Sequence, residues 1–305
     1  MSVAEAALSR VCAVAAEAPS AWLVLVGPTA SGKSDLALAA ASAVGGEIVS
    51  ADSVQIVRGF DVGSGKPTPE ERSRIPHHLI DAVDPLESID ASRFATMADE
   101  SARDIERRGK RVIVCGGTFL WVRALVWGLV DAPAADIAIR DTHKAFALRE
   151  GRPALHEKLA NVDPASAARL HPNDLVRVSR ALEVFQTTGQ RLSDLQAGHG
   201  FRTARRAVRL FGVTRSQDEL TARIRARVRA WLTGGWVDET RALLDAGFGG
   251  ARAMSSVGYR EVATHLRGEL PREALEEAIV RATRVYARRQ RTFLKQAEVE
   301  WLPAP

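Results

Sequence analysis

The chain has 305 residues, of which 46% are apolar and 26% charged, enough to bury one large core or one core with a smaller domain. No apolar run approaches the roughly 20 residues that span a bilayer, and its two cysteines, Cys12 and Cys115, argue against a disulfide framework, so we expect a cytoplasmic protein. The net charge of +5 is uneven: residues 201–305 hold 20 basic against 12 acidic residues, and residues 1–200 hold 22 against 25. A basic C-terminal third favours a polyanionic partner, although a preference for arginine on the surface would give the same count.

The first 128 residues alternate between short apolar runs and helical patterns. We expect residues 1–20 to form an extension that contains a frayed helix. The apolar runs predict buried strands at 22–26, 47–51, 78–82 and 111–115. Helices are predicted to follow the first, third and fourth of these strands. This βαβ order predicts a parallel sheet with helices on both faces.

The alternation stops at about residue 129, where helical patterns continue without a convincing strand. The strand pattern returns at Val208–Val213, and helices are predicted to begin at Ser216, through a capping box, and at Pro271. The simplest interpretation is an α/β catalytic core of residues 21–128 and 205–305 that carries a helical insertion domain of residues 129–204, with boundaries good to about ten residues.

A phosphate-binding loop follows the first predicted strand. The segment Gly27-Pro-Thr-Ala-Ser-Gly-Lys-Ser34 matches G-x-x-x-x-G-K-[ST] and opens a predicted helix, as a loop of the P-loop NTPase type requires. Its backbone N–H groups and the helix N-terminus attract phosphate oxygens, Lys33 adds a positive charge, and Ser34 offers a hydroxyl to Mg²⁺. The residues expected to bind a di- or triphosphate are Gly27, Thr29, Ala30, Ser31, Gly32, Lys33 and Ser34.

The ends of the other predicted strands bear on the reaction. Strand 111–115 ends in Gly116-Gly117-Thr118, without the carboxylate that a nucleotide hydrolase or kinase usually carries there. The acidic residue at a strand end is Asp52, and such ends line the ligand crevice of a doubly wound sheet. Asp52 is therefore placed to act on a second substrate beside the phosphates, as a base or through a metal-bound water. The alternative is that Asp52 caps a following helix.

Further ordered motifs extend along almost the whole chain, from Trp22 to about Trp301. Besides the phosphate loop, they are Ser50–Gln55, Gly59–Pro67, Pro76–Asp81, Gly116–Thr118, His171–Asp174, Arg180–Val184, Thr188-Gly189, Ser256–Arg260, Thr283-Arg284 and Arg288–Gln290. Together these motifs resemble the tRNA dimethylallyltransferase family of the bacterial type.

The resemblance implies alkyl transfer with Mg²⁺ as cofactor. In that family, the N6 amine of the adenosine just 3′ of the anticodon attacks C1 of dimethylallyl diphosphate, and diphosphate leaves. Carried over residue by residue, the catalytic roles fall on Asp52 as the base, on Thr118 near the reacting centre and on Arg223 at the diphosphate. Residue chemistry agrees with these roles, because an aromatic amine must lose a proton and a leaving diphosphate is stabilised by cations.

The resemblance also implies a partner, the anticodon stem-loop of tRNA, whose adenosine would be flipped into the enzyme. It assigns RNA contact to Asp52, Ser53, Val54 and Gln55, to Arg140, to Val176, Arg177, Val178, Ser179 and Arg180, and to Ser255, Ser256, Val257, Gly258, Tyr259 and Arg260. The chain departs from the family pattern at Val57, at Ser64-Gly65 and at Trp121, which would belong either to a prenyl pocket or to the core. We expect no zinc, because the zinc finger of eukaryotic members is absent, and a monomer.

A basic stripe runs along the last predicted helix, where Arg281, Arg284, Arg288, Arg291 and Lys295 are spaced three and four residues apart. We expect Arg284 and Arg288 to contact RNA phosphates, and the alternative is a solvated face. Beside tRNA prenyl transfer, two other hypotheses stay open: a P-loop isopentenyltransferase on free AMP or a small-molecule kinase, and a nonenzymatic RNA-binding or nucleotide-switch protein. The stripe and the insertion favour the first.

Overall fold

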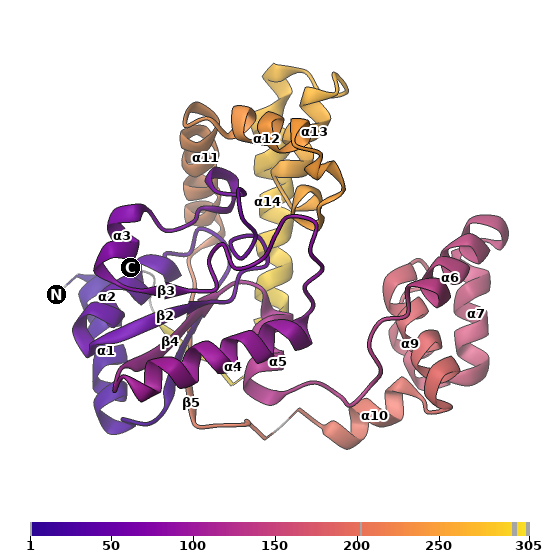
Figure 1. Ribbon diagram of the computed structural model, residues 1–305, viewed down its shortest axis with the longest axis horizontal. Helices are drawn as coiled ribbons and strands as arrows, with labels where there is room; N and C mark the ends of the chain where they lie inside the picture. The colour runs from indigo at the N-terminus through magenta and orange to yellow at the C-terminus, as the bar shows by residue number, and fades with distance from the viewer. Residues whose placement is uncertain (1, 202, 295–297, 303–305) are drawn as a thin grey trace. The chain divides into compact units, whose positions relative to one another are not determined.

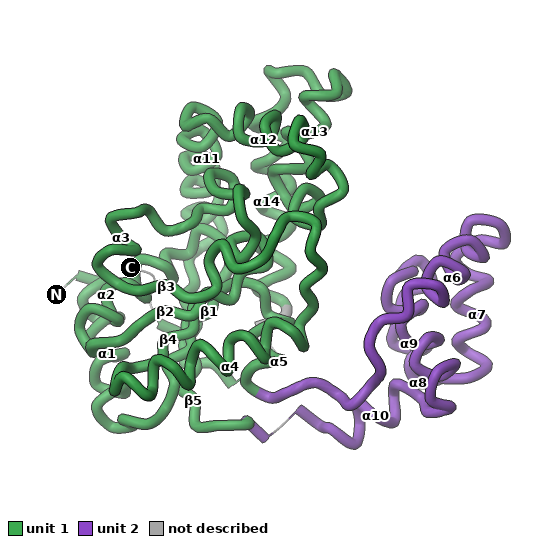
Figure 2. Tube along the Cα trace, in the orientation of Figure 1, with its two compact units in different colours: residues 1–126, 205–305 green, residues 127–204 purple. Residues whose placement is uncertain are grey.

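The computed structural model describes residues 2–201, 203–294 and 298–302. The chain folds into two compact units (Figure 2): unit 1 joins residues 1–126 to residues 205–305, and unit 2 comprises residues 127–204. Unit 2 is therefore inserted between two segments that fold together. In the part of the chain that the structure describes, no helix is both long enough and apolar enough to cross a membrane.

Unit 1 is built on a sheet of six parallel strands in the order β3-β2-β4-β1-β5-β6. Figure 1 labels β2, β3, β4 and β5 of this sheet. The central strand β1 pairs with β4 on one side, where Leu23 lies opposite Ile113, and with β5 on the other. All five residues of β1 are buried, as in a parallel strand covered on both faces. The strands are β1 (Trp22–Val26), β2 (Gly46–Ser50), β3 (His77–His78), β4 (Arg111–Gly116), β5 (Val208–Val213) and β6 (Glu300–Leu302).

Helices cover both faces of the sheet, which confirms the predicted α/β architecture. On one face, α1 (Val3–Glu17) and α2 (Lys33–Val44) pack against alternate strand residues such as Leu23 and Leu25. Because strand side chains alternate, Trp22 points to the other face, where its indole donates a hydrogen bond of 2.7 Å to Glu106 of α4 (Ala91–Arg107). Next to α4 lies α5 (Phe119–Trp127).

The N-terminal helix differs from the prediction, and the structure decides between the two expected placements of Trp121. Helix α1 is not frayed: Ser2 and Glu5 form a capping box, and Ala7, Val11, Val14 and Ala15 are buried against α2, because their spacing makes one apolar face. Trp121 of α5 is buried and stacks on Phe94 of α4 with ring centroids 4.4 Å apart. Trp121 therefore belongs to the core, the second of its two expected placements.

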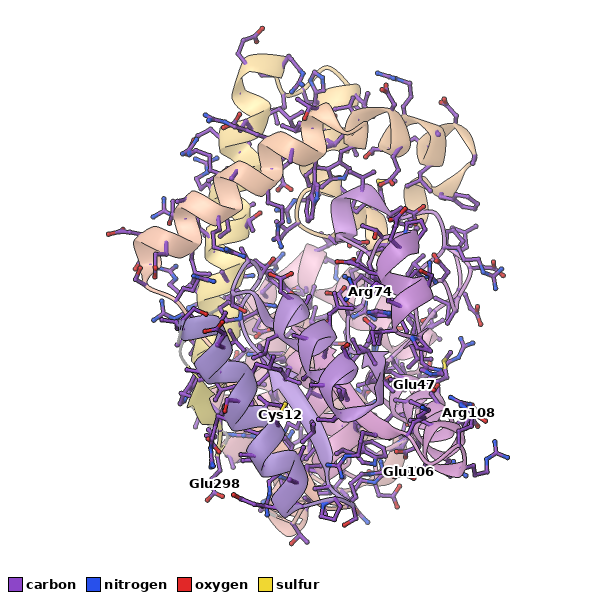
Figure 3. The ribbon with its side chains drawn as sticks, turned by 90° about the vertical axis from the view of Figure 1, so that its left-hand side faces the viewer. Cys12, Glu47, Arg74, Glu106, Arg108 and Glu298 are labelled. Atoms are coloured by element: carbon purple, nitrogen blue, oxygen red, sulfur yellow. The ribbon has the colours of Figure 1, made fainter. Side chains whose placement is uncertain are left out.

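The edges of the sheet also differ from the prediction. Strand β6 was not predicted; its Glu300 lies opposite Phe211 of β5 and accepts a hydrogen bond from Arg10. At the opposite edge, β3 is shorter than the predicted strand 78–82, because Leu79 and Asp81 adopt positive φ. Figure 3 shows this edge, where the buried Glu47 of β2 accepts hydrogen bonds from His78 and Arg108.

After β5 the chain of unit 1 is helical up to Leu294. Helix α11 begins at the predicted capping box of Ser216 and Glu219, and α14 follows Pro271. These two helices pack side by side (Figure 1). The elements of this region are α11 (Gln217–Thr233), α12 (Trp236–Asp245), η2 (Phe248–Gly250), η3 (Arg252–Ser255), α13 (Tyr259–Leu266) and α14 (Arg272–Leu294); η1 (Val62–Ser64) and α3 (Pro69–Arg74) lie between β2 and β3.

In unit 2, where residue 202 is not described, all the regular secondary structure of the described residues is helical. Its own small core gathers Leu155, Leu159, Val178, Ala181 and Leu182 from α7 and α9. The helices are α6 (Ile137–Glu150), α7 (Arg152–Val162), α8 (Pro164–Arg169), α9 (Leu175–Thr188) and α10 (Leu192–His199).

Candidate active site

The phosphate loop joins β1 to α2 through a tight turn of the backbone. Gly32 has φ of +95° and Ala30 has φ of +65°, so the chain turns through left-handed conformations before Lys33 begins the helix. Gly27 leaves no room for a side chain, since a Cβ there would lie 2.4 Å from the carbonyl oxygen of Val213. The Lys33 ammonium lies 3.5 Å from the Pro28 carbonyl, inside the loop.

A cavity of about 520 Å³ opens beside this loop. Thr29, Ala30, Gly32, Lys33 and Ser34 line it, whereas Gly27 and Ser31 do not. The other walls come from five segments of unit 1 and include Ser50, Asp52, Gln55, Lys66, Cys115, Gly116, Arg223, Arg227 and Trp231. The predicted loop, the strand-end aspartate and the predicted arginine therefore meet in one cavity.

Two half-buried cations, Lys33 and Arg227, line this cavity. Burial lowers the pKa of Lys33, and nearby Cys115 and Asp52 oppose the shift. Burial also lowers the pKa of Arg227 to about 10, against the attraction of Asp52. Removing such charges from water costs free energy unless an anion compensates them. The cavity is therefore preorganised for an anion, and a diphosphate matches its position at a helix N-terminus.

Asp52 directly follows β2 and its two carboxylate oxygens differ. Oδ1 accepts hydrogen bonds from the backbone N–H groups of Val54 at 2.9 Å and Gln55 at 3.3 Å. Oδ2 has no hydrogen-bond partner among the described residues. The segment after Asp52 is a turn and not a helix, so the expected capping of a helix takes the form of a capped turn. Asp52 thus holds its own loop with one oxygen, and its other oxygen is left without a partner in the described residues.

Thr118 is tied directly to the Asp52 turn. Its Oγ1 accepts from the Ser53 N–H at 3.1 Å and lies 3.3 Å from the Ser53 hydroxyl, while its N–H donates to the Ala51 carbonyl at 3.2 Å. Gly116 permits this approach, because a Cβ there would lie 2.2 Å from the carbonyl oxygen of Ala51. The ends of β2 and β4 therefore form one rigid wall.

Two arginines of α11 hold the opposite side of the phosphate loop. Arg223 donates to the Ala30 carbonyl at 3.0 Å and lies 3.8 Å from Asp35. Arg227, one turn later, donates to the Thr29 hydroxyl and lies over the Trp231 ring, 4.6 Å from its centroid. The Nε atom of Arg227 is buried and has no hydrogen-bond partner within the described chain. Arg227 was not predicted as a site residue, although its spacing of four from Arg223 places both on one helix face.

Gln55 anchors the loop after β2. It accepts from the Ser50 hydroxyl at 2.9 Å and donates to the carbonyls of Ser64 and Gly65. Gly65, one of the departures from the family pattern, has φ of +61° and leaves no room for a side chain, because a Cβ would lie 2.8 Å from the Trp231 ring. Val57, another departure, is buried and forms a bridge to Val83.

The segment from Ser255 to Arg260, expected to contact RNA, is only partly exposed. The Tyr259 side chain is fully buried, and its hydroxyl donates to Glu239 at 2.6 Å. Gly258 has φ of +96°, and a Cβ there would lie 2.2 Å from the Trp236 ring. Ser255 and Arg260 are exposed. The Tyr259 ring is therefore buried in this structure, and the expected contact of this segment with RNA stays a prediction.

The expected RNA-binding residues of the insertion lie in unit 2. Val176 and Arg177 are exposed at the start of α9, whereas Val178 is in the core and Ser179 is buried against His143. Arg180 and Arg140 both pair with the fully buried Glu183, at 2.9 Å each. Of these five positions and Arg140, four thus present a side chain that is not buried.

The basic stripe lies on the exposed side of α14. Arg281, Arg284, Arg288 and Arg291 are exposed, and Lys295 lies outside the described residues. Away from this stripe, α14 carries Tyr286, whose pKa is raised by burial and by the nearby Asp52 carboxylate. It also presents Gln290, whose amide contacts the phosphate loop. Neither was predicted as a site residue, and for Gln290 the sequence signal was its place in the Arg288–Gln290 motif.

The fold and the site define an α/β enzyme of the P-loop class that carries a helical insertion. Comparison with known proteins makes the assignment more specific. Residues 55–297 match the family model described as IPP transferase. A tRNA dimethylallyltransferase of Sorangium cellulosum is 59% identical over 292 residues, which cover 96% of this chain and 93% of that one.

Two solved structures agree. The full-length tRNA isopentenylpyrophosphate transferase of Bacillus halodurans is 34% identical with a TM-score of 0.69, covering 93% of this chain and 90% of that one. A eukaryotic dimethylallyltransferase described as acting on tRNA is 26% identical with a TM-score of 0.79, covering 93% and 74%. The chain belongs to the tRNA dimethylallyltransferase family.

Proposed function

We propose that this protein transfers a dimethylallyl group from dimethylallyl diphosphate to the N6 amine of the adenosine on the 3′ side of a tRNA anticodon, releasing diphosphate. The observation that carries the proposal is the single cavity shared by the phosphate loop and the free oxygen of Asp52. A hydrolase or kinase is less well supported, because β4 ends in Gly116-Gly117-Thr118 and supplies no carboxylate.

The reaction forms an N6–C1 bond and breaks the bond between C1 and the diphosphate oxygen, whose electron pair leaves with the diphosphate. Asp52 takes the amine proton on Oδ2, while Oδ1 stays bonded to the turn. Positioned proton transfer of this kind is worth about 10²–10⁴ in rate. Thr118 is not among the residues that line the cavity, but it holds the Asp52 turn through Ser53, and we propose that its hydroxyl comes close to the reacting nitrogen.

The negative charge of the leaving group falls on the phosphate loop and its cations. Lys33, Arg223 and Arg227 line the cavity and bring three positive charges to it. Because they are fixed before the reaction by contacts to the loop, they need little reorganisation when charge develops. Gly27 and Ser31 support the loop conformation instead of lining the cavity.

We include Mg²⁺ as the cofactor. Ser34 and Asp52 line the cavity with oxygen atoms, the donor type that Mg²⁺ prefers. Two such protein groups are enough, because Mg²⁺ keeps several of its waters and also binds phosphate oxygens of the substrate. Ser34 would hold the ion, which when bound offsets charge on the diphosphate. Asp52 would face the ion only through water, since its role toward the amine needs Oδ2.

For the RNA, we propose contacts along two surfaces. In unit 1, Arg284 and Arg288 of α14 and the exposed Ser255 and Arg260 offer charge and polarity. In unit 2, Arg140, Arg177 and Arg180 offer three cations. We propose that the protein acts as a monomer in the cytoplasm, where tRNA is found.

Mass spectrometry tests this function. The protein is incubated with dimethylallyl diphosphate, Mg²⁺ and an anticodon stem-loop RNA, and separately with AMP in place of RNA. We expect a mass increase on the RNA at the adenosine after the anticodon, little product with AMP, and neither with Lys33→Ala. Preferential modification of AMP would overturn the tRNA assignment, and absence of any prenyl transfer would overturn the reaction itself.

A further inference from the structure

Gln290 of α14 bridges the two loops that form the candidate active site. Its Oε1 accepts a hydrogen bond from the Thr29 N–H at 2.9 Å, and its Nε2 donates one to the Gly117 carbonyl at 2.8 Å. Thr29 belongs to the phosphate loop, and Gly117 directly precedes Thr118. One side-chain amide therefore spans the diphosphate site and the wall that holds Thr118 and Asp52.

The fit around this amide is close. Gln290 is 5% exposed, and a Cβ on Gly117 would lie 2.4 Å from its Nε2 atom. Buried hydrogen bonds of this kind are strong and directional, because water does not compete for them. Both ends of the amide are satisfied, so its orientation is fixed.

Attachment of α14 to the rest of unit 1 does not depend on Gln290. Leu275, Ile279, Val280 and Ala287 are buried apolar residues of the same helix. Another buried polar residue, Thr283, donates its hydroxyl to the Ile279 carbonyl of its own helix at 2.7 Å and to no loop. The contacts of Gln290 thus differ in kind from those that pack the helix.

We propose that Gln290 is a positioning residue that sets the separation between the bound diphosphate and the attacking amine. The proposal rests on the function proposed above. Displacing Gly117 would move Thr118 and, through the Thr118–Ser53 and Thr118–Ala51 hydrogen bonds, the turn that carries Asp52. Displacing Thr29 would move the loop that holds the leaving group. In-line displacement needs C1 to lie between the attacking amine and the leaving diphosphate. A displacement of either group by about 1 Å therefore costs on the order of 10²-fold in rate.

The first test compares Gln290→Ala with Thr283→Val, a matched change of a buried polar residue on the same helix. Single-turnover transfer is measured at saturating dimethylallyl diphosphate and stem-loop RNA, with RNA affinity and Tm measured beside it. We expect Gln290→Ala to transfer about 10²-fold more slowly with RNA affinity within about threefold of wild type, and Thr283→Val to transfer normally. Equal rates for the two variants would overturn the proposal.

Gln290→Glu provides a second test that a merely structural role would not pass. A protonated Glu can accept from Thr29 and donate to Gly117, whereas an ionised Glu sets a second acceptor against the Gly117 carbonyl. The ratio of its rate to the wild-type rate should therefore rise as pH falls, at a temperature where Tm shows both proteins folded. For Gln290→Ala the ratio should be flat.

This variant also carries the test if Gln290→Ala fails to fold. A flat ratio for Gln290→Glu would overturn the positioning role while leaving the proposed function intact, since the wild-type enzyme would still transfer. An inactive wild-type protein would overturn the proposed function and the role of Gln290 together.

Discussion

Replacing Asp52 by Asn separates two roles of this side chain: holding its own turn and, as we propose, accepting the amine proton. Oδ1 accepts from the N–H groups of Val54 and Gln55, and an Asn oxygen can do the same. Oδ2 has no partner in the described part of the chain, and an amide nitrogen in its place cannot accept the amine proton. Asp52→Asn should therefore fold normally and transfer slowly.

The magnitudes follow from these contacts. A net contribution of about 0.5–1.5 kcal/mol per hydrogen bond predicts that Asp52→Ala, which loses both, costs roughly 1–3 kcal/mol of unfolding free energy. Asp52→Asn should cost less than about 1 kcal/mol, because both bonds stay. Loss of a positioned base should slow transfer by about 10²–10⁴ in either variant.

Single-turnover kinetics at saturating substrates measure the chemical step, and denaturant unfolding measures stability. The Michaelis constant for dimethylallyl diphosphate should move little, since the proposed partner of Asp52 is the amine and not the diphosphate. If added Mg²⁺ restored most of the Asp52→Asn rate, Asp52 would act through a metal-bound water. A rate for Asp52→Asn within about threefold of wild type would refute the assignment of a base.

Three further predictions concern the cations of unit 1. Lys33→Ala should weaken binding of inorganic diphosphate in calorimetry and slow transfer without unfolding the chain, and unchanged turnover would contradict a role for the loop. In the wild type, diphosphate affinity should fall as pH rises through the pKa of Lys33, which burial places below the ordinary 10.5; in Lys33→Arg the fall should be smaller and should reflect Arg227, whose pKa burial lowers to about 10. Arg284→Ala with Arg288→Ala should flatten the plot of log K against log salt for RNA binding by about 0.7 per lost phosphate contact, and an unaltered slope would return both to a solvated face.

The sheet and the phosphate loop could be predicted because their signals are local. Strands β1, β4 and β5 are apolar runs bounded by turns, and the loop lies between a strand and a helix in the sequence itself. Asp52 could be found because parallel strand ends meet at one edge of a sheet. Strand β6 could not, since three residues with an exposed Glu300 and Trp301 carry no strand pattern.

The missed site residues depend on contacts between distant segments. Gln290 meets Thr29, and Arg227 meets the same residue from another helix. Helical periodicity predicts which residues share a face of α14 or α11, but it does not predict which turn of that helix contacts the phosphate loop. Tyr259 shows the converse: its motif pointed to RNA contact, but pattern alone does not reveal that Glu239 and two aromatic rings bury it.

Unit 2 provides a last case in which a motif residue acts through its neighbours. Glu183 is fully buried and accepts hydrogen bonds from Arg140 and Arg180, which we propose contact RNA. Burial raises its pKa, but these hydrogen bonds outweigh that effect, so the net pKa is lowered. The stability that this carboxylate contributes is thus present above its ordinary pKa and lost as pH falls through the lowered one.

Glu183→Gln should remove this pH dependence and weaken stem-loop binding, because neither arginine keeps its charged partner or its orientation. Transfer at saturating RNA should persist, since the cavity lies in unit 1. Glu150→Gln, which alters an exposed pair with Arg149 on α6, is the matched control and should change neither property. Because Arg140 and Arg180 are partly exposed, we expect Glu183→Gln to lower the free energy of unfolding by about 1–3 kcal/mol. This is below the roughly 3–5 kcal/mol that breaking a fully buried pair typically costs. If Glu183→Gln bound RNA as tightly as Glu150→Gln while unit 2 stayed folded, orientation of the two arginines by Glu183 would have no part in RNA recognition.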